Sequence, residues 1–426
     1  MGTIPQPQIR PQARTPPGAA AEVNLPVSAN ARAGISKRIA AGSPALSAAR
    51  NCVASPRPRL DLSATPLYKR RLHEYEAQTP MIDFSTVPRV RLAHLPTPLE
   101  PMDRLSKLLG GPRLWIKRDD CTGLSTGGNK VRKLEFVLAE ALATGADTVV
   151  TAGATQSNHS RQTAAAAARL GLKCHLLLWN MTGISERAYL QNGNILLDRL
   201  HDATIHELPG ADGMDVLTYL NGEVDRLTQQ LRAQGARPYA IPVGASNPRG
   251  ALGYVECARE LISQAKESGL KIDAVLHRSG SAGTQAGLVA GFAVIGAQIP
   301  VIGIGGGTSP TELEELVFRM ATDAASLLGE PSAVKRSAVM ATDPNPVQYG
   351  VLTHEVSEVI NLLARTEGIL VDPVYTGPAL VGMIELIRRG KFPRGSNVVF
   401  IHTGGTAALS GYVDFFATEF AKVGSS

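Results

Sequence analysis

The sequence predicts an α/β protein built from parallel twisted sheets with helices on both faces. Its 426 residues exceed what one ordinary hydrophobic core holds, so two packed units are expected. The chain repeats the order of apolar run, glycine-rich or polar turn and amphipathic helix, and strands that alternate with helices form parallel sheets. Hydrophobic residues make up 44% and aromatic residues only 5%, which suits this class better than an all-β module.

The first part of the chain lacks this pattern. Residues 1–80 are rich in Pro, Ala, Arg and Ser and contain few large apolar residues, so they cannot bury a core. We expect a disordered extension, a transit-like segment or a leader upstream of the true start, with the extension or leader favoured over a transit peptide. Met81 opens the first sequence that has the composition of a folded protein.

The net charge of +6 is concentrated in this first part. Residues 1–71 contain eleven Lys and Arg against two acidic residues, a surplus of nine, so the remainder carries about −3 (6 − 9). The folded part is therefore not basic, which argues against nucleic acid as a partner.

Cysteine, histidine and hydropathy patterns indicate neither a metal site nor a membrane span. The four cysteines form no CxxC, and the nine histidines form no HExxH or Cys/His cluster. Scattered thiols are typical of a reducing compartment, so a cytoplasmic location is expected, or a mitochondrial one if residues 1–80 are a transit peptide. The uncharged stretch Ser279–Thr311 is broken by glycines, Gln298 and Pro300, and predicts a buried helix, a turn and a buried strand.

Three segments give the strand, turn and helix order most clearly. The first has a strand through Val149–Val150, a turn over residues 153–158 and an alanine-rich helix that Gly171 ends. Residues 271–296 and 396–412 repeat the order. In parallel sheets ligands bind beyond the carboxyl ends of the strands, and all these glycine turns are expected there.

Lys130 follows a glycine-rich turn in the stretch GLSTGGNKVRKLEF, with apolar residues after it at helical spacing. A nucleotide P-loop does not fit, because Asn129 separates Gly128 from the lysine and Val131 replaces the magnesium-binding hydroxyl. Two interpretations remain, a solvated lysine near a helix start and a nucleophilic amine. Partial positive charge at a helix start lowers the pKa of an amine, and a neutral amine forms an imine with a carbonyl.

A second motif, SGSAGT at residues 279–284, lies between an apolar strand and an apolar helix. Small residues let backbone N–H groups converge on a phosphate at a helix start, and the hydroxyls add donors. The absence of a neighbouring lysine or magnesium-type carboxylate favours a cofactor monophosphate. The alternative is close helix–strand packing.

Weaker motifs accompany these two. In ATQSNH, Ser157 or Asn158 is expected to cap the following helix. Tyr349 and Tyr375 lie on turns, where packing is the ordinary role, and HTGGT at residues 402–406 predicts a further anion- or ring-contacting turn. An imine-forming lysine combined with a phosphate cradle and no metal site indicates pyridoxal 5'-phosphate.

Together the motifs resemble the family of 1-aminocyclopropane-1-carboxylate deaminases, D-cysteine desulfhydrases and L-cysteate sulfo-lyases. The stretches that carry the resemblance run in order from Pro88 to Tyr412: STGGNKVRKLEF, GATQSNHSRQTAA, SGSAGTQAGL, ARTEGILVDPVYTG and FIHTGG. The resemblance implies a tryptophan-synthase-β-like, fold type II pyridoxal-phosphate enzyme. A larger cofactor-binding domain would comprise residues 81–130 and 246–426, and a smaller α/β domain residues 131–245. The family also suggests a homodimer.

The resemblance also assigns roles to residues of this chain. Lys130 would hold the cofactor covalently, and Asn129 would contact the ring hydroxyl. The phosphate would be bound by Ser279, Gly280, Ser281, Ala282, Gly283 and Thr284. Gln156, Ser157 and Asn158 would bind the substrate carboxylate, with Ser157 also assisting proton transfer. Tyr349 and Tyr375 would flank the substrate, and Thr376 or Thr403 would lie near the pyridine nitrogen.

Departures from the family pattern bear on the reaction. Deaminases have glutamate at the position of Thr376, and a neutral partner leaves the ring a weaker electron sink. This favours β-elimination of a good leaving group over opening of a cyclopropane. Leu352 and His354 stand where relatives favour proline and an acid, and Arg278 precedes the cradle where a small residue is usual. Arg278 either helps to bind a sulfonate or faces away.

The expected reaction is elimination from a small cysteine-like amino acid, giving pyruvate and ammonia. D-cysteine is the first substrate, with release of hydrogen sulfide; L-cysteate, with release of sulfite, is second, and 1-aminocyclopropane-1-carboxylate is third. The alternative of another class is a non-catalytic phosphate- or nucleotide-binding α/β protein. Against it stands the lack of a P-loop hydroxyl and of metal-binding carboxylates.

Overall fold

The computed structural model describes Ile82, Phe84 and residues 86–210, 213–306, 308–343 and 348–423. The described residues belong to one compact unit. The expectations for residues 1–80 and for Met81 lie outside the described residues. Among the described residues, no helix is long and apolar enough to cross a membrane.

Two sheets organise this unit. The larger has the strand order β1-β2-β10-β7-β8-β9, with β1 at Leu99–Pro101, β2 at Arg113–Lys117, β10 at Asn397–Ile401, β7 at Ala274–Arg278, β8 at Val301–Ile304 and β9 at Val339–Thr342. The smaller has the order β5-β4-β3-β6, with β5 at Thr204–Leu208, β4 at Lys173–Trp179, β3 at Thr148–Ala154 and β6 at Pro238–Ala240. The smaller sheet falls within residues 131–245, while the division into two domains stays a prediction.

Every pairing is parallel except that of β1 with β2, which is antiparallel. The predicted parallel sheets are therefore confirmed, and β1 adds one antiparallel edge strand to the larger of them. The connection over residues 102–112 is short for a parallel crossover, which needs a dozen or more residues, and β1 is an edge strand with one neighbour.

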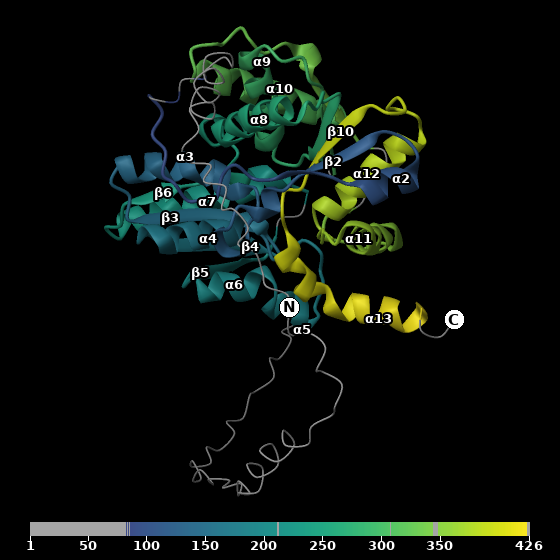
Figure 1. Cartoon of the computed structure of the whole chain (residues 1–426). Helices are drawn as coiled ribbons and strands as arrows, with labels where there is room; N and C mark the ends of the chain where they lie inside the picture. Colours follow the sequence, from purple (N-terminus) through teal and green to yellow (C-terminus); the bar gives the residue numbers. More distant parts are fainter. Residues whose placement is uncertain are drawn as a thin grey trace, which may run out of the picture. The chain divides into compact units, whose positions relative to one another are not determined.

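Helices cover both faces of the larger sheet, as Figure 1 shows on either side of β10. On one face lie α8 (Pro248–Ser268), α9 (Gly283–Ile295) and α10 (Pro310–Ser326), and on the other α2 (Asp103–Leu109), α11 (His354–Glu367) and α12 (Thr376–Arg388). Side chains of β10 alternate between the two cores: Val399 belongs to the first and Phe400 to the second. This alternation is the period-two pattern of a strand buried on both sides.

The smaller sheet is covered in the same way. One core joins its strands to α3 (Lys130–Ala143), α4 (Asn158–Leu170) and α6 (Asn194–Leu200), and a second joins them to α7 (Val216–Ala233). The remaining helices are α5 (Arg187–Gln191), α13 (Val413–Val423) and the 3-10 turns η2 (Asp119–Cys121), η3 (Leu124–Thr126), η4 (Val243–Ala245), η5 (Arg336–Ala338) and η6 (Thr406–Tyr412).

The predicted strand, turn and helix segments are confirmed with one difference. Strand β3 and helix α4 match the first segment, and Gly171 ends α4 in a left-handed conformation at φ +70°. The uncharged stretch forms α9 and β8. After β10 the chain forms the 3-10 helix η6, where the repeated order predicts an α-helix.

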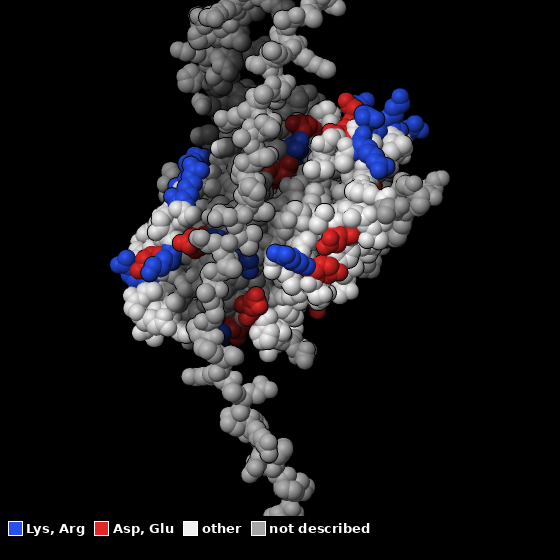
Figure 2. Space-filling model, turned by 90° about the horizontal axis from the view of Figure 1, so that it is seen from below, with Lys and Arg blue, Asp and Glu red and all other residues white. Residues whose placement is uncertain are grey.

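The described surface bears charges of both signs. On the face in Figure 2, basic and acidic side chains lie interspersed rather than gathered in one broad basic patch.

Candidate active site

A cavity of about 250 Å³ lies beyond the carboxyl ends of strands from both sheets. This is where ligands bind in open parallel sheets. Its wall comprises Asn129, Lys130, Gly153, Ala154, Ser157, Asn158, His159, Met181, Asp215, Val216, Leu217, Leu220, Val243, Gly244, Arg278, Ser279, Gly280, Ser281, Ala282, Thr284, Gly306, Thr308, Tyr349, Tyr375 and Thr403. Most of the residues singled out from sequence therefore meet here.

Lys130 enters this cavity as the first residue of α3, as predicted. The preceding turn depends on two glycines in the left-handed region, Gly127 at φ +77° and Gly128 at φ +124°. A Cβ on Gly127 would lie 1.8 Å from the backbone oxygen of Asp120. Only glycine can therefore carry the chain through this bend into the helix that begins with Lys130.

Burial sets the charge of Lys130. Protein atoms surround the side chain, while its end reaches the cavity, so its surface exposure is intermediate. Burial lowers the pKa of the amine to about 8 from its ordinary value of 10.5. The lowered pKa agrees with the sequence-based expectation, but its cause is desolvation of the ammonium group. A substantial neutral fraction is the form that reacts with carbonyl carbons.

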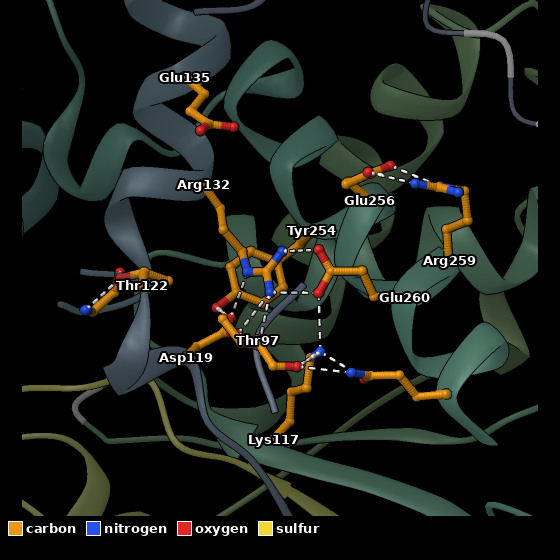
Figure 3. Close-up of polar contacts among 12 residues, drawn as sticks. Thr97, Lys117, Asp119, Thr122, Arg132, Glu135, Tyr254, Glu256, Arg259 and Glu260 are labelled. Carbon is orange, nitrogen blue, oxygen red and sulfur yellow. Dashed lines mark hydrogen bonds and ion pairs between the residues drawn. The ribbon is translucent and has the colours of Figure 1, made fainter. Parts of the chain in front are cut away.

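A buried network fixes the start of α3, as Figure 3 shows. Arg132 binds Asp119 and Glu260 with N–O distances of 2.8 to 2.9 Å, and Lys117 donates to Glu260 at 2.9 Å. Tyr254 donates to Asp119 at 2.6 Å. The two cations and two carboxylates balance, which is the condition for burying charges without a large penalty.

The predicted phosphate cradle, residues 279–284, lies between β7 and the start of α9. The Oγ of Ser279 is buried and has no hydrogen-bond partner among the described residues. The backbone N–H groups of Gly280, Ser281 and Ala282 donate to no other described residue, and Ala282 holds φ +63°. Unsatisfied donors at a helix start form an anion site.

The cradle is tied to α3 through a short chain of polar contacts. Ser281 and Ser246 have their Oγ atoms 2.7 Å apart, and the Nζ of Lys133 donates to Ser246 at 2.9 Å and to the Gly244 oxygen at 3.0 Å. Burial, then the charge of Lys130, lower the pKa of Lys133 well below its ordinary value. An anion in the cradle would offset the free-energy cost of keeping the ammonium group of Lys133 charged in this buried position.

Ser157 caps α4, as predicted, and also lines the cavity. Its Oγ accepts from the N–H of Ser160 at 3.1 Å. Asn158 is buried on the cavity wall, where its amide contacts the guanidinium of Arg161, which also donates to the Gly127 oxygen at 2.7 Å. The start of α4 is thereby joined to the turn before Lys130.

Gln156 points elsewhere. Its Nε2 donates to the Tyr189 oxygen at 2.6 Å and to the Asn192 oxygen at 3.0 Å, and its Oε1 accepts from the N–H of Asn194 at 2.9 Å. It is not part of the cavity wall. The side chain therefore supports the neighbouring loop, and a direct contact with substrate would require these bonds to break.

The two tyrosines meet as a pair. Their hydroxyl oxygens are 2.5 Å apart and their rings cross at 77°. Burial raises the pKa of Tyr375 to about 12, and it raises that of Tyr349 well above the ordinary value. Both hydroxyls are neutral at pH 7, so the pair can donate a hydrogen bond into the cavity.

The structure separates the two threonines considered for the pyridine nitrogen. Thr403 lines the cavity, and its backbone oxygen accepts from the N–H of Asn129 at 3.0 Å. Thr376 is fully buried outside the wall, and its hydroxyl donates to Asp372 at 2.5 Å. Thr403 alone of the two faces the cavity.

The residues present fit pyridoxal phosphate. The cradle offers an unpaired buried hydroxyl and free N–H groups for a phosphate, and Lys130 offers an amine of lowered pKa for an aldehyde. Asn129 is buried on the wall and donates to Thr284 at 3.1 Å. Gly283 is not part of the wall, and its contribution is space, because a Cβ there would lie 2.7 Å from the Nζ of Lys133 and 2.8 Å from the Oγ of Ser246. Among the described residues, no group of three or more potential ligands for a metal ion occurs.

Sequence reasoning missed several wall residues, among them His159 and Gly244, and left Arg278 without a definite role. His159 lies directly after the ATQSN turn, and burial first, then Lys130 and Lys133, lower its pKa well below the ordinary value. Gly244 faces Lys130, whose Nζ would be 3.3 Å from a Cβ at that position. Arg278 does not face away but lines the cavity, whereas His354 is exposed on α11 outside it.

The chain is similar to known proteins over most of its length. A family model described as pyridoxal-phosphate dependent enzyme matches residues 90–404. A D-cysteine desulfhydrase of Yersinia enterocolitica is 46% identical over 325 residues, which cover 76% of this chain and 96% of that protein. A solved structure of an ACC deaminase homologue is 36% identical, with a TM-score of 0.69 over 79% of this chain and 97% of that one. A structure of O-ureido-L-serine synthase, 18% identical with a TM-score of 0.52 over 74% of this chain and 92% of that one, shares the fold.

Proposed function

The chain belongs to the family of pyridoxal-phosphate-dependent enzymes, and from this premise we propose that it is a D-cysteine desulfhydrase. The family resemblance, the fold type II class and the cofactor predicted from sequence are confirmed. The reaction would convert D-cysteine and water to pyruvate, ammonia and hydrogen sulfide. The observation that carries the proposal is that Lys130, with its lowered pKa, lies in the same cavity as phosphate donors that have no partner among the described residues.

Each wall residue has a proposed task. When bound, pyridoxal phosphate supplies an aldehyde that condenses with amines and a ring that withdraws electrons from the substrate α-carbon. Residues 279–284 hold the phosphate through N–H groups and hydroxyls, and Lys130 holds the aldehyde carbon through its amine. Asn129 contacts the ring hydroxyl, and Thr403 lies near the pyridine nitrogen.

Proton transfer is assigned to Lys130, because its pKa of about 8 lets the amine gain or lose a proton near neutral pH. With its amine free, Lys130 would take the proton from the substrate α-carbon, and the Oγ of Ser157 would assist by hydrogen bonding. Asn158, at the start of α4, binds the α-carboxylate together with Ser157, where the helix N-terminus favours negative charge. Gln156 contributes to this subsite by holding the loop. Tyr349 and Tyr375 flank the substrate, and a neutral hydroxyl of this pair hydrogen-bonds the departing sulfur.

The experiment has a spectroscopic and a chemical part. Purified protein is expected to absorb visible light, and borohydride is expected to trap the cofactor on Lys130, while Lys130→Ala loses both properties. Pyruvate, sulfide and sulfite are then measured with D-cysteine, L-cysteate and 1-aminocyclopropane-1-carboxylate. A colourless protein that stays inert after reconstitution contradicts the proposal, as does turnover of the cyclopropane substrate alone.

L-cysteate remains the second substrate, because an arginine lines the cavity. The homodimer also remains a proposal, tested by light scattering during size-exclusion chromatography. A cytoplasmic location is likewise proposed and is tested by fractionation of cells that express the full chain.

A further inference from the structure

Arg278 is the last residue of β7 and lies on the cavity wall next to the cradle. Its Nη1 donates to the Gly305 oxygen at 2.6 Å, which turns the side chain over the end of β8. Among the described residues, no carboxylate oxygen lies within ion-pair distance of its guanidinium. Burial lowers the pKa of the guanidinium, although the group stays charged at neutral pH.

The protein makes room for this side chain. A Cβ on Gly306 would lie 1.7 Å from the Nη2 of Arg278 and 2.4 Å from its Cζ. Any other residue at position 306 would push the guanidinium out of its position. The Arg278 side chain is only partly exposed, and a partly buried cation that has no carboxylate partner beside a cavity indicates a bound anion.

The carboxylates in and around the cavity wall do not supply that anion. Asp215 is the wall's acidic residue, and its carboxylate accepts from the N–H and hydroxyl of Thr218 at 2.9 Å while capping α7. Asp343 and Asp372 contribute favourable charge to Arg278 from beyond ion-pair distance. The Oδ1 of Asp343 has no partner among the described residues, and the carboxylate of Asp372 accepts from its own turn, including the hydroxyl of Thr376. The anion must therefore enter with a ligand.

The other subsites of the cavity indicate which part of the ligand carries the anion that Arg278 binds. The cradle takes the cofactor phosphate, Lys130 faces the reacting amine, and the start of α4 takes the α-carboxylate under the proposed function. The charge of Arg278 acts on Tyr375, so the guanidinium is on the side of the tyrosine pair that flanks the substrate. This leaves the β-substituent as its partner.

We propose that Arg278 is a specificity-determining residue that binds the sulfur substituent of the substrate as an anion, either a thiolate or a sulfonate. This inference rests on the proposed function and deepens it. Arginine gives charge-assisted hydrogen bonds to such groups and is attracted to sulfur oxyanions as it is to carboxylates. A substrate without a charged β-substituent would gain nothing from it.

The test compares holoenzymes of the wild type, Arg278→Gln and Arg278→Lys. The visible spectrum of the bound cofactor gives the dissociation constants of L-cysteate and L-alanine, and that of D-cysteine where turnover is slow enough. Separately, KM and kcat are measured with D-cysteine and 3-chloro-D-alanine. We expect Arg278→Gln to weaken cysteate binding, or to raise KM for D-cysteine, about tenfold or more. Alanine binding and KM for 3-chloro-D-alanine should change less than about twofold, and the lysine variant should be intermediate.

A second variant addresses position rather than charge. Gly306→Ala keeps the arginine but displaces it, so it should weaken anion binding in the same direction as Arg278→Gln. A larger loss with D-cysteine identifies a thiolate, and a larger loss with L-cysteate identifies a sulfonate.

Two results overturn the inference. One is an equal loss for alanine and cysteate in Arg278→Gln. The other is a loss of cofactor affinity in that variant, which would make Arg278 a phosphate ligand. The dissociation constant of L-cysteate is read where release of sulfite is slow enough, and that of L-alanine needs no elimination. Failure of the wild type to release sulfide from D-cysteine would therefore remove the proposed function while leaving the role of Arg278 under test.

Discussion

Arg132, two residues after Lys130 on α3, is paired with Glu260 on α8 through an Nη2–Oε2 contact of 2.8 Å (Figure 3). Both side chains are almost completely buried, and Lys117 donates to the same carboxylate. Lys130 is thus attached to the larger core by an ion-pair network rather than by apolar packing alone.

Glu260→Gln should destabilise the fold, because it leaves Arg132 and Lys117 buried with Asp119 as their remaining carboxylate. Breaking a buried pair by removing one charge costs about 3–5 kcal/mol in the free energy of unfolding. The matched control is Glu223→Gln, which removes the partner of the exposed Arg226 and should cost less than about 1 kcal/mol. Urea unfolding of both variants gives the comparison, and equal losses would show that the network adds nothing.

The same network predicts sensitivity to acid. Burial alone would raise the pKa of Glu260, but Arg132 and Lys117 outweigh it and lower the pKa to about 2 from 4.5. A carboxyl whose folded pKa is lowered stabilises the protein above its unfolded pKa, and this contribution is lost as the pH falls from about 4.5 towards 2. Unfolding free energies of Glu260→Gln should therefore fall less steeply than those of the wild type between pH 5 and the acid limit of folding. Parallel slopes would contradict this assignment.

Capture of the cofactor by apoprotein should accelerate as the pH rises through about 8. With the pKa of Lys130 near 8, about a tenth of the amine is neutral at pH 7 and about nine tenths at pH 9. The rate of reconstitution, followed by the visible absorbance, should rise nearly ninefold between pH 7 and pH 9, in proportion to the neutral fraction of the amine. A rate that keeps rising towards pH 10.5 would show that burial does not lower the pKa.

Thr403→Ala and Thr376→Ala should separate a cofactor effect from a stability effect. Thr403 faces the cavity, so its loss should change the visible spectrum and the affinity of the cofactor with little change in apoprotein stability. Thr376 exchanges two hydrogen bonds with Asp372, so its loss should cost about 1–3 kcal/mol in unfolding free energy. If Thr376→Ala instead shifts the spectrum more than Thr403→Ala, Thr376 rather than Thr403 is the threonine that acts on the cofactor ring.

Local sequence predicts much of this site because the relevant residues lie at junctions of elements. Lys130, Ser157 and residues 279–284 each stand where a strand has ended and a helix begins, and helix starts and glycine turns leave recognisable patterns. Chain order cannot predict which of two neighbouring hydroxyls faces a cavity. Thr376 turns to Asp372 because that carboxylate also collects the N–H groups of Val374 and Tyr375, a local arrangement that only the folded turn displays.

Long-range placement explains what sequence left undecided for Arg278 and β1. The direction of Arg278 depends on the Gly305 oxygen and on the space at Gly306, both contributed by the neighbouring strand and its loop. The antiparallel edge of the larger sheet depends on a connection too short for a crossover. Neither the direction of the Arg278 side chain nor the pairing of β1 with β2 is visible as a residue pattern within a single segment of the sequence.

The paired hydroxyls of Tyr349 and Tyr375 predict non-additive effects on turnover. Each oxygen has the other as its neighbour at 2.5 Å, so either substitution by Phe leaves the remaining hydroxyl without the partner that orients it. Each single variant should lower kcat for D-cysteine by about 10² or more, the usual contribution of a positioned proton donor, and the double variant should be hardly worse. The measurement is a double-mutant cycle on kcat, with cofactor content determined from the visible spectrum of every variant. Losses that multiply would mean that the two tyrosines act separately, and unchanged kcat in both single variants would remove them from the reaction.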